Sequence, residues 1–229
     1  MNPLSDTSVI IPAYNEAESI GRVVDGLLEL GCEVVVVDDG SVDGTYGTCL
    51  AYPVSLLRHA CNLGQGAALK TGLAYALSVV RPRYVVTFDA DGQHRPEDVR
   101  RLVAALADGA HDAALGTRFA RKADAAAVPL GRRLLLRAAT LFTRISTGLP
   151  VTDAHNGLRA FTADAAVQLE MAQSGMAHAS EILTLIHRKK LRWCEVPVRV
   201  EYTEYSRRKG QRGLGAVNIL WDMMTGRLR

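Results

Sequence analysis

The stretch EVVVVDDGSVDGT, residues 33–45, joins four consecutive valines to two aspartates and a glycine-containing turn. Valine is β-branched and favours strands, and an unbroken apolar run predicts a strand that is buried on both faces. Such strands are typical of parallel sheets covered by helices. Ser41 and Asp43 are good helix N-cap residues, so a helix is expected after the turn. The stretch therefore predicts a strand, turn and helix unit with acidic residues where the strand ends.

The same alternation of short apolar runs and longer helical patterns extends through the first half of the chain. Strands are predicted at Ser8–Pro12, Glu33–Asp38, Val54–Leu57, Tyr84–Asp89 and Ala113–Gly116. Helices are predicted at Glu16–Leu30, Gln65–Val80 and Pro96–Ala107, and further along at Arg133–Thr147, Ala163–Met171 and Ser180–Lys190, before a strand at Trp193–Tyr202. This rhythm predicts an α/β protein with a Rossmann-like, mostly parallel central sheet and helices on both faces.

Size and composition exclude several classes of protein. The 229 residues are 48% hydrophobic, which is enough for a real core. The formal net charge of +3 gives no broad basic face for nucleic acid, so no nucleic-acid partner is expected. The four cysteines are widely separated and form no CxxC or Cys/His pattern, which argues against structural zinc and a disulfide framework. A reducing cytoplasm is the expected compartment.

Membrane-spanning and secretory segments are not expected either. The start, MNPLSDTS, lacks a basic region followed by an apolar one, and no uncharged apolar run reaches the roughly 18 residues that a spanning helix needs. Peripheral association with the inner face of the cytoplasmic membrane stays open, because the end of the chain is basic and partly apolar.

Polar residues follow the predicted strands at the points where ligands bind in parallel α/β sheets. The ligand crevice of such a sheet lies beyond the carboxyl ends of its strands. Here those positions hold Tyr14 to Glu16, then Asp38 and Asp39, then Asp89 and Asp91, then Arg118. Three acidic clusters and one arginine are therefore expected at one edge of the sheet.

The segment FDADGQH, Phe88 to His94, is the strongest chemical signal. Residues two apart in an extended chain face the same side, so Asp89 and Asp91 can present both carboxylates to one Mg²⁺ or Mn²⁺ ion. Such an ion would neutralise the charge that grows on a departing diphosphate. Gln93 or His94 could add a ligand or support one. The alternative is an Asp-Gly turn with solvated carboxylates.

Two further segments are candidates for the nucleotide site. Asp38 and Asp39 point to opposite sides of their strand, so one of them is expected to reach a ligand, and we choose Asp39. In NLGQGAALKTG, Asn62 to Gly72, glycines such as Gly66 allow close backbone approach to a ligand, although a plain strand-to-helix turn is an equal alternative. Arg118, at a strand end, could hold a phosphate, against the alternative of a surface arginine.

Taken together, the motifs resemble family 2 glycosyltransferases, and in particular the dolichyl- or polyprenyl-phosphate sugar synthases. The likeness runs from about Ser8 to about Gln211, in the family's order and spacing. It is carried by SVIIPAYNE, VVVVDDGSVDGT, NLGQGAALKTG, FDADGQH, GTRF, TDAHNGLRAF and EVPVRVEYTEYSRRKGQ. The resemblance implies a GT-A fold, an inverting transfer and a divalent metal. Many synthases of this type carry C-terminal membrane helices, and no such helix is expected in this sequence.

The resemblance also implies roles for individual residues. The base and ribose would be flanked by Pro12, Tyr14, Glu16 and Asp39, with Ala90 lining the nucleotide site. Asp89, Asp91 and Gln93 would bind the metal, and the catalytic set would be Asp89, Asp91 and Arg118. Arg118, Arg132 and Arg133 resemble positions used for the acceptor or donor phosphates. Asp153, Asn156 and Arg159 match the acceptor-side motif, and the expected acceptor set also includes Arg208 and Lys209. His155 stands where a smaller residue is expected, and Arg95 replaces an expected proline.

The chain is expected to form one GT-A domain over residues 1–229. Residues 1–118 would bind the nucleotide-sugar and the metal, and residues 119–229 would bind the acceptor and end in an amphipathic helix. Ala120–Pro129 reads as a mobile loop. In the stretch from Leu214 to Met224, Val217, Leu220, Trp221 and Met224 recur at helical spacing, as in an interfacial helix. An equal alternative is that these four apolar side chains pack against the core or against a homodimer partner.

The expected reaction passes a sugar from a GDP- or UDP-sugar to a lipid monophosphate, which needs no general base because its oxygen is already anionic. The basic segments His187–Arg192 and Tyr205–Arg212 suit a phosphate pocket or an anionic membrane surface. A membrane-embedded partner subunit is a further hypothesis.

Three alternatives stay open. One is transfer to a sugar hydroxyl, with Asp153 or Glu181 as the base. A second is a sugar nucleotidyltransferase, although the glycine-rich arginine-lysine loop usual at its start is missing here after Val9 to Ile11. The third is a non-catalytic protein that binds nucleotide-sugars.

Overall fold

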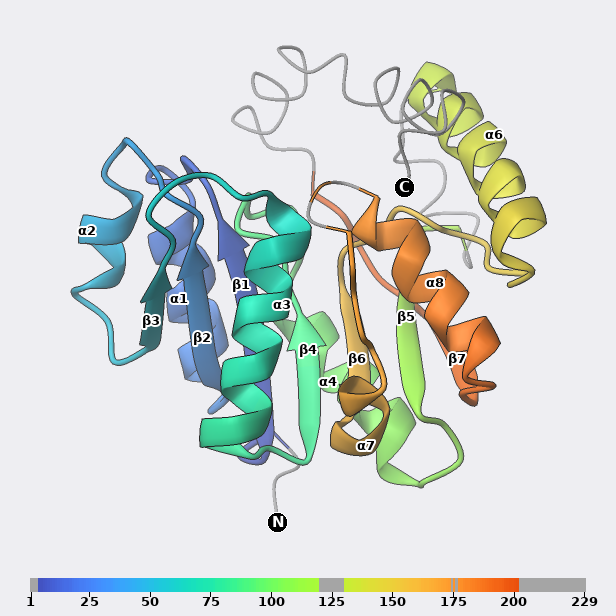
Figure 1. Ribbon diagram of the computed structural model, residues 1–229, viewed down its shortest axis with the longest axis horizontal. Coiled ribbons are helices and arrows are strands. Elements are labelled where there is room, and N and C mark those ends of the chain that lie inside the picture. Colours follow the sequence, from blue (N-terminus) through green and yellow to red (C-terminus); the bar gives the residue numbers. More distant parts are fainter. Residues whose placement is uncertain (1–3, 120–129, 174, 176, 202–229) are drawn as a thin grey trace.

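A seven-stranded sheet, in the order β3-β2-β1-β4-β6-β5-β7, forms the centre of the computed structural model (Figure 1). The structure describes residues 4–119, 130–173, 175 and 177–201, and for residues 130–138 the helix without its side chains. The strands are β1 (Thr7–Ala13), β2 (Glu33–Asp38), β3 (Ser55–Arg58), β4 (Tyr84–Thr87), β5 (Ala113–Thr117), β6 (Arg159–Thr162) and β7 (Trp193–Pro197). These strands pair in parallel except at β6, which runs antiparallel to β4 and β5. The mostly parallel sheet is confirmed.

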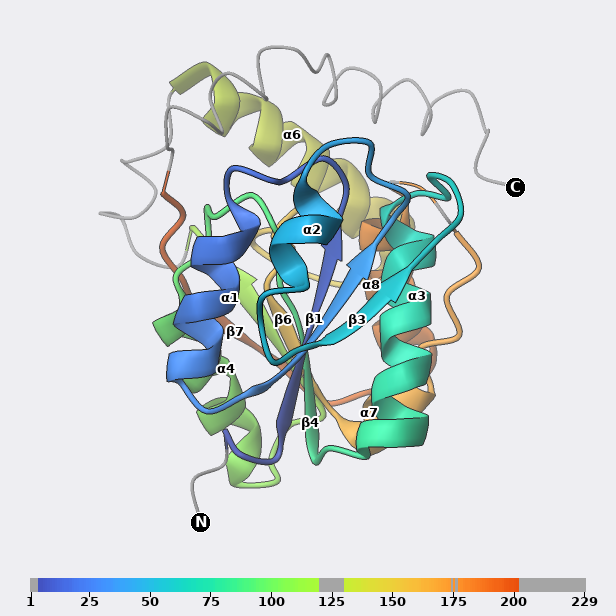
Figure 2. The ribbon, with the colours of Figure 1, turned by 90° about the vertical axis from the view of Figure 1, so that its left-hand side faces the viewer.

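Helices cover both faces of the sheet (Figure 2). One face carries α1 (Ile20–Glu29) and α4 (Pro96–Ala107), and the other carries α3 (Gln65–Tyr75), α7 (Ala163–Val167) and α8 (His178–Arg188). The short helix α2 (Thr45–Cys49) follows β2, and α3 continues into a π-helical turn, Ala76–Val80. The long helix α6 (Leu130–Thr147) lies across the carboxyl-end side of the sheet. In the described residues no helix is long and apolar enough to cross a membrane.

The valine run of β2 explains why helices pack on both faces of the sheet. Val34 and Val36 are buried in the core cluster that includes residues of α1 and α4, whereas Val35 and Val37 are buried against Ala68 of α3. Successive residues of a strand point to opposite faces, so a run without polar interruption has no solvent-facing side. The expectation of a doubly covered strand is confirmed.

The loops after β1 and β2 hold each other through side chains. The main-chain N–H groups of Asn15, Glu16 and Ala17 donate to Ser41 Oγ (2.9 Å), Thr45 Oγ1 (2.8 Å) and Asp43 Oδ2 (3.2 Å). Helix α1 therefore begins at Ile20 and not at Glu16 as predicted. The prediction that Ser41 and Asp43 cap the next helix is wrong, because the N-cap of α2 is Gly44 without a side-chain cap.

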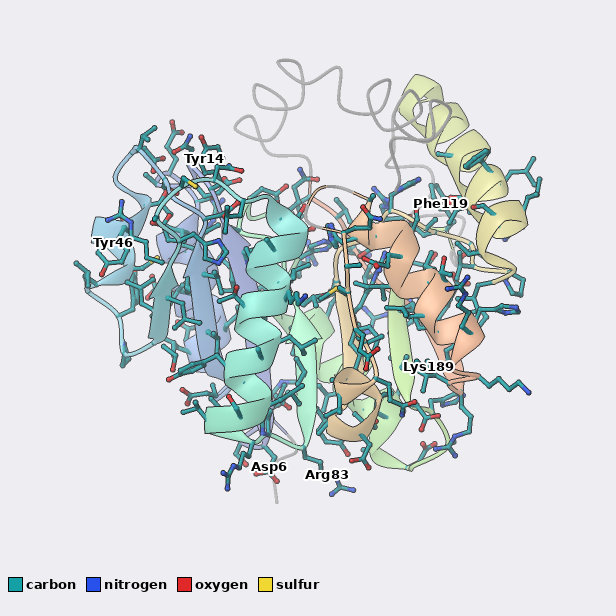
Figure 3. The ribbon with its side chains drawn as sticks, viewed as in Figure 1. Asp6, Tyr14, Tyr46, Arg83, Phe119 and Lys189 are labelled. Atoms are coloured by element: carbon teal, nitrogen blue, oxygen red, sulfur yellow. The ribbon has the colours of Figure 1, made fainter. Side chains whose placement is uncertain are left out.

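Several other boundaries differ from the predictions. Strand β4 ends at Thr87 and β7 at Pro197, and α7 ends at Val167, each earlier than expected. Strand β6 was not predicted. The carboxyl ends of β1 and β5 lie on the same side, where Figure 3 shows Tyr14 and Phe119, while Asp6 and Arg83 lie at the opposite edge.

Candidate active site

A cleft of about 550 Å³ opens at the carboxyl ends of β1, β2, β4 and β5. One wall comes from the loops after β1 and β2, the floor from the segment after β4, and the far wall from Arg118 and the loop that leads into β6. Its lining includes Pro12, Tyr14, Glu16, Asp39, Gly64, Gln65, Asp89, Ala90, Asp91, Gln93, His94, Arg118, His155, Asn156, Gly157 and Val200. The predicted convergence of strand-end residues on one edge is therefore observed.

Asp89 and Asp91 both line this cleft. Asp89 accepts hydrogen bonds from Gln65 Nε2 (3.0 Å) and pairs with His94 Nε2 (3.2 Å). Asp91 accepts from the main-chain N–H of Gln93 (3.0 Å) and from its side-chain Nε2 (2.8 Å). Gln93 thus holds the Asp91 carboxylate in place here, and its role as a direct metal ligand stays a prediction.

The electrostatics of the pair are unequal. Burial, and after it the negative charge of Asp89, raise the pKa of Asp91 to about 6, although the hydrogen bond from the Gln93 main chain acts to lower it. For Asp89, burial acts to raise the pKa, but the hydrogen bond and charge of His94, with His178 and Arg159, hold it below its usual value. Negative charge is therefore crowded on the floor of the cleft.

This donor set fits a hard divalent cation. Magnesium is usually bound through one or two carboxylates together with waters and substrate phosphates, and not by an all-protein cage. Asp89 and Asp91 supply two carboxylates on one open cleft, and a cation between them would relieve their mutual repulsion. Among the described residues no cluster of three or more His, Cys, Asp or Glu side chains is suited to a metal ion.

Asp39 lines the cleft and fixes the loop that leads into α3. It is 2% exposed and accepts from the main-chain N–H groups of Leu63 (2.9 Å) and Gly64 (2.8 Å), and it pairs with His59 Nδ1 (2.7 Å). Asp38 does not line the cleft and pairs with Arg58 Nε (3.0 Å). The two aspartates therefore face different surroundings, as their alternation along the chain predicts.

Arg118 forms a buried, two-pronged ion pair with Asp153. Arg118 Nε and Nη2 donate to the two carboxylate oxygens of Asp153 at 2.6 and 2.7 Å. Burial acts to raise the pKa of Asp153, but the Arg118 charge and hydrogen bonds hold it below the usual value. Arg118 lines the cleft and Asp153 does not, so Asp153 positions Arg118 from behind. Glu181, the other expected base, accepts from the main chain of Ala172 and Gln173 and also does not line the cleft.

The remaining predicted residues lie in different places. Arg159 is buried and donates to the carbonyl oxygens of Ala154, Asn156 and Ala179, and burial lowers its pKa to about 10. Gly66 is buried in the first turn of α3 and does not line the cleft. The side chains of Arg132 and Arg133, the Ala120–Pro129 loop, Arg208, Lys209 and the Leu214–Met224 stretch lie outside the described residues.

The basic run His187–Arg192 is not part of this cleft. It begins in the last turn of α8 and continues beyond the helix, and Figure 3 shows Lys189 well away from Tyr14 and Phe119. Arg192 pairs with Asp112 before β5 (2.6 Å). The run therefore does not contribute to a phosphate pocket at this cleft, and its alternative role toward an anionic membrane surface stays a prediction.

Sequence reasoning placed Asn156 in an acceptor-side motif but did not foresee that His155, Asn156 and Gly157 together form the far wall of the cleft. The rule it used inspects residues that follow strands, whereas these residues precede β6. Because β6 is antiparallel, its first residue, Arg159, lies opposite Thr87, the last residue of β4. The start of β6 therefore lies at the edge where its neighbours end.

The chain returns to the floor of the cleft after β7. Val200 forms a bridge with His94, and the main-chain N–H of Glu201 donates to Gln93 O (2.8 Å). Arg95 also pairs with Glu201 (2.5 Å). The last described residues thus lie beside the Asp89–Asp91 segment.

Comparisons with known proteins agree with this geometry. The family model described as "Glycosyl transferase family 2" matches residues 8–169. The chain is 31% identical to a UDP-N-acetylglucosamine–dolichyl-phosphate N-acetylglucosaminyltransferase of Methanococcus voltae, over 94% of each protein. It is 33% identical to an undecaprenyl-phosphate mannosyltransferase of Micrococcus luteus, over 96% of this chain and 97% of that protein.

Among solved structures, the fold is similar to that of glucosyl-3-phosphoglycerate synthase from Mycobacterium tuberculosis in complex with Mg²⁺ and uridine diphosphate. The TM-score is 0.67 at 21% identity, and the match covers 86% of this chain and 71% of that one. This likeness shows the GT-A fold. With the family model matching most of the chain and relatives above 30% identity along nearly its whole length, the chain belongs to glycosyl transferase family 2.

Proposed function

We propose that the protein is an inverting, metal-dependent glycosyltransferase that moves a sugar from a GDP- or UDP-sugar to a polyprenyl or dolichyl phosphate. The observation that carries the proposal is the single cleft that brings together Asp39, the Asp89 and Asp91 carboxylates, and Arg118. Two relatives are named as transferases that act on dolichyl phosphate and undecaprenyl phosphate, which supports the acceptor class.

In this proposal the residues of the first two loops bind the nucleoside. Pro12, Tyr14 and Ala90 offer surface for the base, and Glu16 and Asp39 offer carboxylate oxygens to base or ribose. Asp89 and Asp91 would hold Mg²⁺ or Mn²⁺, which supplies electrostatic stabilisation of the departing nucleoside diphosphate. Residues up to about 118 would thus serve the donor, and the rest would serve the acceptor.

Arg118 would attract the acceptor phosphate from the far wall. The buried Asp153 fixes its guanidinium, so little rotamer freedom is lost when a phosphate binds. A phosphate acceptor needs no general base, because its oxygen is already anionic. Asp153 and Glu181, the bases that a sugar hydroxyl was expected to need, do not line the cleft, which favours the phosphate.

The proposal also includes peripheral association with the cytoplasmic face of a membrane, where such lipid phosphates reside. The basic residues Arg208 and Lys209, which lie outside the described residues, are proposed to act on the acceptor phosphate or on an anionic membrane surface. The membrane-anchoring partner subunit and the homodimer stay predictions, which chemical crosslinking in membranes tests.

The test incubates the protein with Mn²⁺ and a panel of GDP- and UDP-sugars, with and without a polyprenyl phosphate. We expect release of nucleoside diphosphate and a lipid-linked sugar that both require the lipid phosphate. Pyrophosphate release would instead indicate a nucleotidyltransferase, and binding without turnover would indicate a non-catalytic binder. Transfer to sugar hydroxyls alone would overturn the acceptor class.

Asp91→Asn tests the metal-binding part of this proposal. The variant should keep its unfolding temperature, since it removes a charge from a crowded carboxylate group, yet lose metal-dependent turnover by roughly several hundredfold, as when a main electrostatic element is removed. Glu29→Gln, at an exposed position on α1, is the matched control and should keep full activity. Wild-type rates in Asp91→Asn would refute the assignment.

A further inference from the structure

A small inner chamber of about 120 Å³ lies directly behind the cleft. It shares the residues Pro12, Gln65, Asp89 and Asn156 with the cleft, so the two spaces meet at the Asp89 carboxylate. Its deeper walls come from α3, from the start of β6 and from the first turns of α8. Nothing in the proposed roles of the cleft residues uses this chamber.

The chamber contains a buried hydrogen-bond donor that has no partner among the described residues. Asn156 is 3% exposed, and its Oδ1 accepts from the main-chain N–H of Leu158 (3.0 Å), but its Nδ2 has no partner. His155 Nε2, beside it, is also buried without one. Buried polar side-chain atoms are nearly always hydrogen-bonded, so an unpaired amide N–H here points to a ligand atom that accepts hydrogen bonds.

The other walls limit what that ligand atom belongs to. Leu69, Ala179 and Ile182 give the chamber an apolar side. The Arg159 guanidinium also borders it but already donates to three main-chain carbonyl oxygens, which leaves it poorly placed to bind a phosphate. A group that suits this space has a carbonyl-type acceptor on one side and a small apolar end on the other.

We infer that the inner chamber receives the acylamino substituent of the donor sugar, so that the enzyme prefers a 2-acetamido sugar to the plain hexose. The inference rests on the proposed function, because the metal site at Asp89 and Asp91 is what places the sugar beside the chamber mouth. A volume of 120 Å³ corresponds to about four water molecules at roughly 30 Å³ each, which suits the four heavy atoms of an acetamido group. Its carbonyl oxygen accepts from Asn156 Nδ2, and its methyl group packs on Leu69, Ala179 and Ile182.

The test compares donors that differ only in this substituent. Binding of UDP-N-acetylglucosamine and UDP-glucose, and of UDP-N-acetylgalactosamine and UDP-galactose, is measured by calorimetry with Mn²⁺ and without acceptor. We expect the acetamido member of each pair to bind at least about tenfold more tightly, the ratio typical of one well-filled pocket. Equal or tighter binding of the plain hexoses, or binding of GDP-mannose with no UDP-sugar bound, would overturn the inference.

Two variants show whether the chamber is the cause. In Asn156→Ser the hydroxyl can still accept from Leu158 N–H in an equivalent turn, but the amide donor is gone. Ala179→Leu fills the chamber from α8. Each should reduce the acetamido preference to about twofold or less, and Ala179→Leu, at a residue that does not line the cleft, should leave UDP-glucose binding and the unfolding temperature near wild type. A preference that survives both variants contradicts the inference.

The outcomes separate this inference from the proposed function. Binding is measured without acceptor, so a preference for acetamido sugars without any transfer to polyprenyl phosphate would refute the transferase and leave the chamber assignment standing. Transfer of sugars to the lipid phosphate with no tighter binding of the acetamido donors would refute the chamber assignment and leave the transferase standing.

Discussion

Gly157 stands so close to Asp89 that the absence of a side chain decides where the carboxylate lies. A Cβ atom added at Gly157 would be 2.2 Å from Asp89 Oδ2 and 2.6 Å from Oδ1. Real Cβ atoms do not approach oxygen atoms this closely, so one of the two segments has to move. The position of one proposed metal ligand thus depends on a glycine 68 residues further along the chain.

Gly157→Ala should therefore displace Asp89 and weaken Mn²⁺ binding, measured by electron paramagnetic resonance of free Mn²⁺. Turnover is expected to fall about a hundredfold, the loss typical of a misplacement of roughly 1 Å in an active site. Gly47→Ala, where an added Cβ meets nothing within 4 Å, is the control and should bind Mn²⁺ normally. Unchanged Mn²⁺ affinity in Gly157→Ala would contradict this view of the site.

At the scale of elements, α3 approaches the sheet closely because of Gly72. A Cβ atom added there would lie 2.4 Å from Ile10 Cγ2 in β1 and 3.1 Å from Val37 Cγ2 in β2. This close approach brings the first turn of α3, with Gly64 and Gln65, to the cleft.

We expect Gly72→Ala to lower the free energy of unfolding by about 1–2 kcal/mol. Overpacking costs about 1–3 kcal/mol, and the better helix propensity of alanine offsets up to about 1 kcal/mol of it. Urea denaturation gives the value, and Gly47→Ala in α2 should be neutral or slightly more stable. A stabilised Gly72→Ala variant would mean that the helix and sheet are not packed as described.

The Arg118–Asp153 pair joins the end of β5 to the loop before β6 and makes stability depend on pH. The pKa of Asp153 is lowered in the folded protein, so its contribution is complete above the unfolded-state value of about 3.9 and is lost as the pH falls through the lower folded value. Asp153→Asn should cost about 3 kcal/mol at pH 7, because it leaves Arg118 buried without its counter-charge.

Urea denaturation from pH 7 to pH 3 measures this effect, and the difference between wild type and Asp153→Asn should shrink below about pH 4. Asp112→Asn removes a similar pair with the exposed Arg192 and should cost at most about 1 kcal/mol. Equal costs for both variants at pH 7 would show that burial adds nothing to the first pair.

Strands made of an unbroken apolar run were easier to predict than β6, which lies between β4 and β5 in the sheet. β1, β2, β4 and β5 are apolar runs whose two faces are both buried, and that pattern is visible in the residues themselves. β6 spans only Arg159–Thr162, begins with an arginine and becomes a strand through pairing with β4 and β5. Only Ala160 and Phe161 of this strand are apolar, so local preference is too weak to specify it.

For the whole molecule, the central sheet joins the two proposed halves, residues 1–118 and 119–229, through strand pairing. β6 lies between β4 and β5, and β5 pairs with β7, so hydrogen bonds cross between residues before and after position 118. Without the second half, β5 has no partner strand and β4 keeps only β1, and without the first half β6 and β7 have no partner strand at all.

Unfolding by urea should therefore follow a single transition, with the far-ultraviolet and near-ultraviolet circular dichroism curves coinciding. A fragment of residues 1–118 should not fold, because β5 would lose both β6 and β7. Two separate transitions, or a folded 1–118 fragment, would show that the halves are independent domains.

The sequence by itself determined the class of fold, the order of the early strands and helices, and the placement of Asp39, Asp89, Asp91 and Arg118 at strand ends, because these follow from local periodicity and from a general rule of parallel sheets. Only the tertiary structure decided that Asp153 is paired behind Arg118, that Gly157 sets the position of Asp89, and that Asn156 faces an inner chamber. These relations join residues 35 to 68 positions apart through the antiparallel strand β6, and no local pattern encodes a contact across such a distance.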